Sequence, residues 1–117
     1  MPTIRELVGA VAQRDGVEAA IVLGRDGLLI DGRAGGGLDA ERLAALVPAV
    51  TAAAEELSAD ANRGGLVTAV LEYERGLALI CSLTTEALLL VLVHPTANVG
   101  SLLFELRRHR GSIAAIV

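Results

Sequence analysis

Residues 43–54 have the sequence LAALVPAVTAAA and carry no charge, and Thr51 is the only polar side chain among them. At helical periodicity, the larger side chains of this region form one apolar stripe, and alanines form a second stripe on the opposite side. The larger stripe is Leu43, Leu46, Val47, Val50, Ala54 and Leu57, and the alanine stripe is Ala45, Ala49 and Ala52. A helix that is apolar all round is buried all round. We therefore expect the larger stripe to face the core and the alanines to form a subunit interface.

Length and composition predict one folded domain. The chain has 117 residues, of which 53% are hydrophobic, and Phe104 and Tyr73 are its only aromatic side chains. A chain of this length buries about two thirds of its unfolded surface. The longest apolar run, Ala87–Val93, is far shorter than the ~20 residues that a membrane-spanning helix needs. The N-terminal sequence also lacks the pattern of a signal peptide. We expect a single domain over residues 1–117, located in the cytoplasm and without membrane insertion.

Charge and residue usage argue against several classes of function. A net charge of −4 and the scarcity of aromatic side chains argue against a nucleic-acid binder. All ten cationic residues are arginine, which excludes chemistry that needs a lysine. Cys81, His94 and His109 do not form a zinc-ligand set, and no serine lies in a nucleophile-elbow context. We expect no cofactor, no metal and no enzyme activity.

Local signals predict the element order α-β-β-α-β-β-β-α. Thr3 and Asp39 are expected helix N-caps, and Asp26-Gly27 predicts a tight hairpin turn. Pro48 removes a backbone donor inside the second helix, so it should kink that helix or divide it. The expected helices are residues 3–14, 39–62 and a last helix that begins after Asn98, and the expected strands are residues 17–23, 28–33, 66–73, 77–83 and 87–93.

The connectors between the last three strands are short, so these strands should run antiparallel. The last two strands are apolar at nearly every position, which indicates that helices cover both faces of the sheet. The predicted fold class is therefore α/β of the α+β type, with a five-stranded antiparallel sheet and helices on both faces. In the last helix, the side chains expected to face inward are Val99, Leu103, Leu106 and Ile113, and Gly111 is expected to fray or end it.

Several short motifs accompany this element order. They are Gly16-Val17 before the first strand, Asp26-Gly27-Leu28 in the first hairpin, an alanine-rich second helix, Gly76 at an acidic hairpin tip, and Ala97-Asn98-Val99-Gly100 at the start of the last helix. Together they make the chain similar to the roadblock/dynein light chain family, in particular to prokaryotic members of the gliding-motility type that regulate Ras-like GTPases. The resemblance implies a roadblock/profilin-like fold and a homodimer in which second helices and third strands pair.

This resemblance implies both an interface and a function. The expected dimer-interface residues are Ala45, Ala49, Ala52, Ala53, Leu66, Thr68 and Val70. The implied function is that of a homodimeric, non-catalytic binding partner of a small Ras-like GTPase, with activation of GTP hydrolysis as one form of regulation. The alternative is a scaffold or light-chain-like adaptor in a signalling or motor complex, without effect on GTP hydrolysis.

Arginines supply the candidate contacts to that partner. Arg25 and Arg75 lie at hairpin tips, where we expect them to be exposed. They are either ordinary solvated turn residues or groups that reach a nucleotide in trans, as arginine fingers do. Arg107, Arg108 and Arg110 cluster near the end of the last helix. There they either complement the helix dipole or form a rim for an acidic partner.

Overall fold

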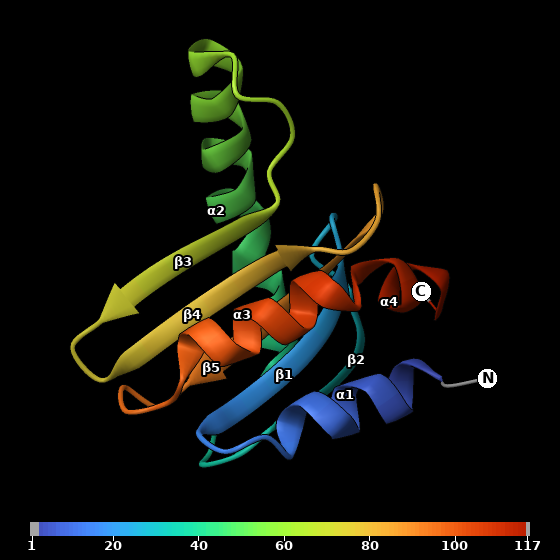
Figure 1. Cartoon of the computed structure of the whole chain (residues 1–117), viewed down its shortest axis with the longest axis vertical. Coiled ribbons are helices and arrows are strands. Elements are labelled where there is room, and N and C mark those ends of the chain that lie inside the picture. Colours follow the sequence, from blue (N-terminus) through green and yellow to red (C-terminus); the bar gives the residue numbers. More distant parts are fainter. Residues whose placement is uncertain (1–2, 117) are drawn as a thin grey trace.

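Figure 1 shows the computed structural model, which describes residues 3–116 except for the side chains of Arg110, Ala114 and Ile116. The expected place of the Arg110 side chain in the arginine cluster therefore lies outside the described residues. The helices are α1 (Ile4–Ala12), α2 (Ala40–Ala61), α3 (Val99–Arg108) and α4 (Arg110–Ile116), and the strands are β1 (Val17–Gly24), β2 (Leu29–Ala34), β3 (Thr68–Tyr73), β4 (Gly76–Ser82) and β5 (Ala87–Val93).

The strands form one five-stranded antiparallel sheet in the order β2-β1-β5-β4-β3. Strands β2 and β3 are therefore its two edges. Helices α1, α3 and α4 cover one face of the sheet, and α2 lies on the other face (Figure 1). This arrangement confirms the predicted α+β fold with helices on both faces. None of the helices within residues 3–116 is long and apolar enough to cross a membrane.

Side-chain caps begin three of the helices where the local sequence predicts them. The Thr3 hydroxyl accepts a hydrogen bond from the Glu6 N–H at 3.2 Å. The Asp39 carboxylate accepts one from the Arg42 N–H at 3.3 Å, and the Asn98 side-chain oxygen accepts one from the Ser101 N–H at 2.9 Å. Each bond satisfies a backbone donor that has no partner within its own helix.

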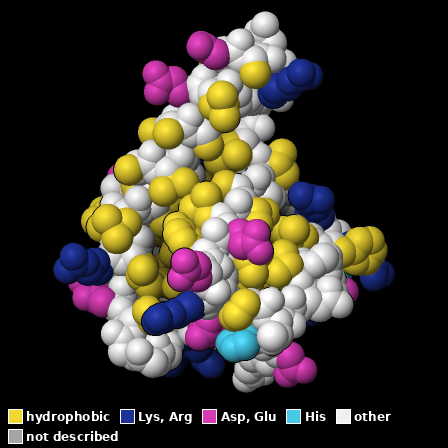
Figure 2. Space-filling model, turned by 90° about the vertical axis from the view of Figure 1, so that its left-hand side faces the viewer, with side chains coloured by type: hydrophobic (Ala, Val, Ile, Leu, Met, Phe, Trp, Pro, Cys, Tyr) yellow, Lys and Arg dark blue, Asp and Glu magenta, His cyan; other side chains and the backbone are white. Residues whose placement is uncertain are grey.

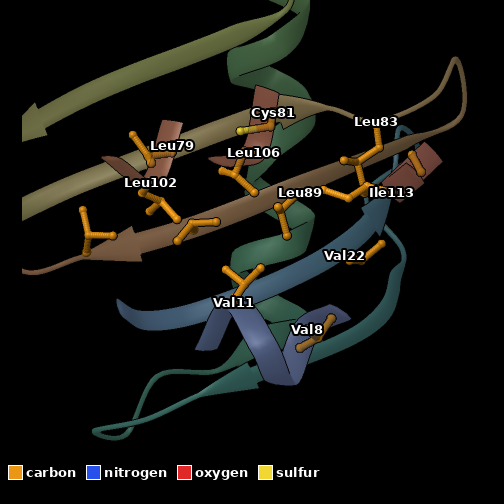
Figure 3. Packing of buried hydrophobic residues seen from close by; sticks show 14 residues of the cluster. Val8, Val11, Val22, Leu79, Cys81, Leu83, Leu89, Leu102, Leu106 and Ile113 are labelled. Carbon is orange, nitrogen blue, oxygen red and sulfur yellow. The ribbon is translucent and has the colours of Figure 1, made fainter. Parts of the chain in front are cut away.

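The face covered by α1, α3 and α4 holds the larger aliphatic core (Figure 3). Val8 and Val11 of α1, and Leu102 and Leu106 of α3, point onto the sheet together with Ile113 of α4. The strand side chains beneath them are Ala20, Val22, Leu79, Cys81, Ala87, Leu89, Val91 and Val93, and Leu83, which follows β4, packs with them. Burial of this apolar surface anchors the three helices, because it is the main favourable contribution to folding.

The last helix differs from its prediction in two respects. It ends at Arg108 rather than at Gly111, and Gly111 lies inside a separate short helix, α4, which begins at Arg110. Leu102, which was not predicted to face inward, is buried with Leu106, whereas Leu103 and Val99 are only partly buried. Leu102 and Leu106 lie one turn apart on the same helix face, so they present a straight apolar ridge to the sheet.

The second core lies between α2 and the opposite face of the sheet. Ala44, Val47 and Thr51 are the buried residues of α2, and α2 packs mainly on β1 and β2. A Cβ atom on Gly27 would lie 3.2 Å from Pro48 Cγ and 3.4 Å from the Ala45 Cα, so the β1–β2 turn presses directly against the helix. Gly27 also has a φ of +90°, which the tight turn requires.

The predicted orientation of α2 is partly wrong. Val47 is buried, and Leu43 and Val50 pack partly against the core as expected. Leu46 and Leu57, however, are 60% and 72% exposed. The helix presents small side chains to the turn and the sheet, and its C-terminal half extends beyond the sheet (Figure 1). Two leucines predicted to be buried therefore lie on the surface of the chain.

Pro48 does not divide α2, which continues unbroken from Ala40 to Ala61. The buried Thr51 hydroxyl donates toward the carbonyl oxygens of Pro48 and Val47, at 3.2 and 3.4 Å respectively. A hydroxyl that bonds to the preceding turn is satisfied within its own helix. The only polar side chain of the alanine-rich segment is thus buried without needing a partner from the sheet.

Candidate interaction surface

The outer side of α2 is uncovered, and it is apolar from Ala45 to Ala53, with the exposed Arg42 before this segment and the exposed Glu56 after it. The four alanines expected in an interface, Ala45, Ala49, Ala52 and Ala53, are all exposed. Leu46 and Leu57 lie exposed on the same helix and add large side chains to this surface. Because the prediction placed both leucines in the core, it missed them as interface candidates. Their exposure depends on which part of the helix the sheet covers, and the periodicity within the helix does not report this.

Strand β3 provides the second part of this surface. It pairs with β4 on one side and has no strand on the other. Val70 of β3 is 46% exposed, and Val67, which precedes the strand, is also exposed. The strand begins at Thr68 rather than at the predicted Leu66. The backbone N–H of Leu66 instead donates to a carboxylate oxygen of Glu55 in α2 at 3.3 Å.

The ladder with β4 determines which backbone groups of β3 are free. The Ser82 N–H donates to the Val67 carbonyl oxygen at 2.9 Å. Hydrogen-bonded positions alternate along an antiparallel pair. Ala69 therefore directs its backbone toward β4, whereas Thr68 and Val70 direct their N–H and C=O groups toward the open edge. Unpaired groups on an apolar edge are a template for another strand.

Together these features form what we call the α2–β3 surface. It comprises Ala45, Leu46, Ala49, Ala52, Ala53 and Leu57 of α2, and Val67, Thr68 and Val70 at the edge of the sheet. Figure 2 shows hydrophobic side chains gathered on this side of the molecule. Large exposed apolar patches of this kind mark interaction sites.

Arg25 lies beneath this surface and is not the exposed tip residue that we expected. Its side chain is 32% exposed. The Nη2 atom donates to the Ser82 hydroxyl at 2.6 Å and to the Thr84 carbonyl oxygen at 3.2 Å. The Nη1 atom lies 3.8 Å from the same Glu55 oxygen that accepts from the Leu66 N–H. The guanidinium thus connects the first hairpin, α2 and the end of β4.

We expect Arg25→Ala to lower the free energy of unfolding by about 1–2 kcal/mol, because it removes two hydrogen bonds and leaves the Ser82 hydroxyl without its donor. The ion pair with Glu55 is half-exposed and adds little to this loss. Urea denaturation followed by circular dichroism measures the change. Arg75→Ala is the matched control and should stay within about 0.5 kcal/mol of the unmodified chain. Equal stability of the two variants would contradict the role assigned to Arg25.

The structure does not bring the four candidate arginines to one place. Arg75 is exposed in the turn after β3. Arg107 lies near the start of that strand, where it lines a small cavity with Val67 and Thr68. Arg107 and Arg108 are exposed on α3, which covers the sheet face opposite α2. These side chains therefore cannot act as one cationic cluster.

Within residues 3–116, no group of three or more His, Cys, Asp or Glu side chains is placed to hold a metal ion. His94, which follows β5, contacts the Thr96 hydroxyl at 2.8 Å. His109, at the end of α3, lies 3.6 Å from Glu105 of the same helix, so the two histidines belong to different parts of the fold. Ser82 bonds to Arg25 rather than to a histidine. The two histidines and Ser82 thus form contacts within the fold, and the feature that stands out is the α2–β3 surface.

The chain has the architecture of the roadblock class of α+β domains. Helix α2 covers one face of its five-stranded antiparallel sheet, α1 and α3 cover the other, and α2 lies beside a free strand edge. A model of the Roadblock/LC7 domain matches residues 3–93, and the chain belongs to this family. A protein of Methanocaldococcus jannaschii, described as uncharacterized, is 33% identical over 102 residues, which cover 87% of this chain and 86% of the relative.

Two solved structures share the fold. The Roadblock/LC7 domain from Streptomyces avermitilis matches with a TM-score of 0.85 and 20% identity, over 96% of this chain and 95% of that one. The gliding protein MglB from Thermus thermophilus matches with a TM-score of 0.85 and 22% identity, over 96% of this chain and 86% of that one. At these identities the similarity establishes the fold alone.

Proposed function

We propose that this chain is a homodimeric, non-catalytic regulator of a small Ras-like GTPase. The observation that carries the dimer is the α2–β3 surface, in which an exposed apolar helix face lies beside an unpaired strand edge. The family resemblance supports the GTPase as partner, and the likeness in fold to the gliding protein MglB is consistent with it.

A second copy of the chain fits this surface because one patch can meet itself across a two-fold axis. Two copies of β3 would pair edge to edge, and the alanines would let two α2 helices approach closely. Leu46 and Leu57, which the described residues 3–116 leave exposed, would then become buried. Permanent homodimer interfaces commonly bury upwards of ~2,000 Å² and are more apolar than the rest of the surface.

In this proposal the chain acts on the GTPase without an active site of its own. Arg25 is bound to Ser82 and Thr84, so Arg75 is the hairpin arginine left for direct contact with a partner. Any acceleration of hydrolysis then comes from repositioning of the GTPase's own residues or from that exposed side chain. The dimer supplies two equivalent copies of each contact, so a single bound GTPase would use them asymmetrically.

Regulation requires different affinities for the two nucleotide states, because a partner that binds both equally shifts no equilibrium. We expect at least about a tenfold difference in Kd between the GTP-analogue and GDP forms of the cognate GTPase. Isothermal titration calorimetry measures it, with a purified Ras-like GTPase from the same organism as the partner. Equal affinities, or no binding, would contradict the regulator and favour the scaffold or adaptor.

A further inference from the structure

Helix α3 carries a second surface stripe that the α2–β3 surface does not include. Its residues recur at the i, i+3, i+4, i+7, i+8 spacing of one helix face, which we call the outer α3 face. They are Gly100, Leu103, Phe104, Arg107 and Arg108, and they line an open hollow of about 640 Å³. The buried ridge of Leu102 and Leu106 lies on a different side of the helix. Helix α3 therefore buries one apolar face against the sheet and exposes a second face, partly apolar and partly cationic, to solvent.

The N-terminal half of this face is apolar and recessed. Phe104 is 63% exposed, although it is one of only two aromatic side chains in the chain. A Cβ on Gly100 would meet only the Asn98 side-chain oxygen, at an ordinary contact distance of 3.7 Å. Gly100 is the second residue of α3, and packing within residues 3–116 does not require a glycine there. Its absent side chain leaves space one turn before Phe104.

The C-terminal half of the face is cationic and unpaired. Arg107 and Arg108 are exposed, and neither forms an ion pair with a side chain within residues 3–116. The acidic residue nearest along the helix, Glu105, faces the α1 side and lies 3.6 Å from His109. Complementing the dipole of α3 accounts for the charges, but it does not account for the exposed aromatic side chain one turn away.

We propose that the outer α3 face docks an acidic peptide segment of a partner protein, with an apolar side chain of that segment seated against Phe104 and Gly100. Two guanidinium groups without carboxylate partners complement an acidic segment, because arginine binds carboxylates through paired hydrogen bonds. An apolar anchor would bury Phe104, and exposed aromatic and arginine side chains are typical of binding hot spots.

The charge of the whole chain favours a peptide over a nucleic acid. The net charge is −4, and the face offers two described cations and one aromatic ring, whereas nucleic-acid surfaces track many phosphates. The outer α3 face lies on the side of the sheet opposite α2. Arg107, however, also lines the small cavity with Val67 and Thr68 of the α2–β3 surface, so sedimentation equilibrium of the Arg107→Glu/Arg108→Glu variant checks that self-association is unchanged.

The probe is a short fluorescein-labelled peptide in which glutamates flank a pair of leucines, and fluorescence anisotropy with the full chain measures its Kd. We expect the double variant Arg107→Glu/Arg108→Glu to weaken binding about tenfold or more, since charge reversal turns attraction into repulsion. Gly100→Leu, which fills the recess, should weaken it severalfold. Binding should also weaken as salt rises.

The control is Arg5→Glu/Arg63→Glu, which reverses two exposed arginines away from this face and should leave the Kd within about twofold. Circular dichroism melting of each variant checks that it is folded. Peptides with glutamine for glutamate, or serine for leucine, should each bind more weakly. Equal loss in the control variant, tighter binding of a single-stranded oligonucleotide, or no binding of the probe at millimolar concentration would overturn the proposal.

Discussion

Replacing Ala49 by glutamate is expected to raise the Kd of the homodimer about a hundredfold or more. Ala49 is exposed on α2, on the side that carries the exposed Leu46 and Leu57. In the proposed dimer this side becomes buried, and a carboxylate there would lose its hydration without gaining a partner. An uncompensated buried charge costs about 3–5 kcal/mol, which corresponds to a change in Kd of that size. Sedimentation equilibrium over a range of concentrations measures it.

The matched control is Ala10→Glu, which places the same charge on an exposed alanine of α1, on the other side of the sheet. This variant should dimerise like the unmodified chain, and circular dichroism melting should show that both glutamate variants are folded. A monodisperse monomer for the unmodified chain at micromolar concentration would rule out the dimer. An Ala49→Glu variant that dimerises normally would place the interface elsewhere.

Replacing Val70 by proline is expected to weaken the dimer about tenfold or more. The Val70 N–H points to the open edge of the sheet, so its loss leaves the β4 ladder of the same chain intact. Proline is tolerated on an edge strand for this reason, but it cannot donate to a second strand and its ring obstructs the approach. The same sedimentation experiment applies, with the free energy of unfolding measured in parallel.

Two further variants show whether the effect arises at the edge. Val70→Thr keeps a β-branched side chain and the N–H, so it should retain the dimer. Ala69→Pro removes an N–H that points to β4, so it should reduce the stability of the monomer as well. If Val70→Pro leaves self-association unchanged while the chain stays folded, the two copies do not pair through β3.

Local signals were sufficient for the five strands, the first two helices and their order, but they did not show that the last helix is divided into α3 and α4. Thr3, Asp39 and Asn98 each cap a helix because an N-cap bond spans only three residues of chain. Short connectors made the strands antiparallel, and the apolar runs of β4 and β5 correctly indicated a sheet covered on both faces. The same order supported the roadblock fold, which the comparisons establish.

Contacts between distant segments decided the rest. Periodicity found the two apolar stripes of α2 and correctly left the alanines exposed, but it placed Leu46 and Leu57 in the core, because the sheet and the turn at Gly27 decide which part of the helix is covered. The partial burial of Arg25 depends on its hydrogen bond to Ser82, which lies 57 residues further along the chain than Arg25. The free edge at β3 depends on the strand order. Helical and strand periodicities are properties of short segments, whereas burial and hydrogen-bond partners arise only when segments far apart in the chain pack together.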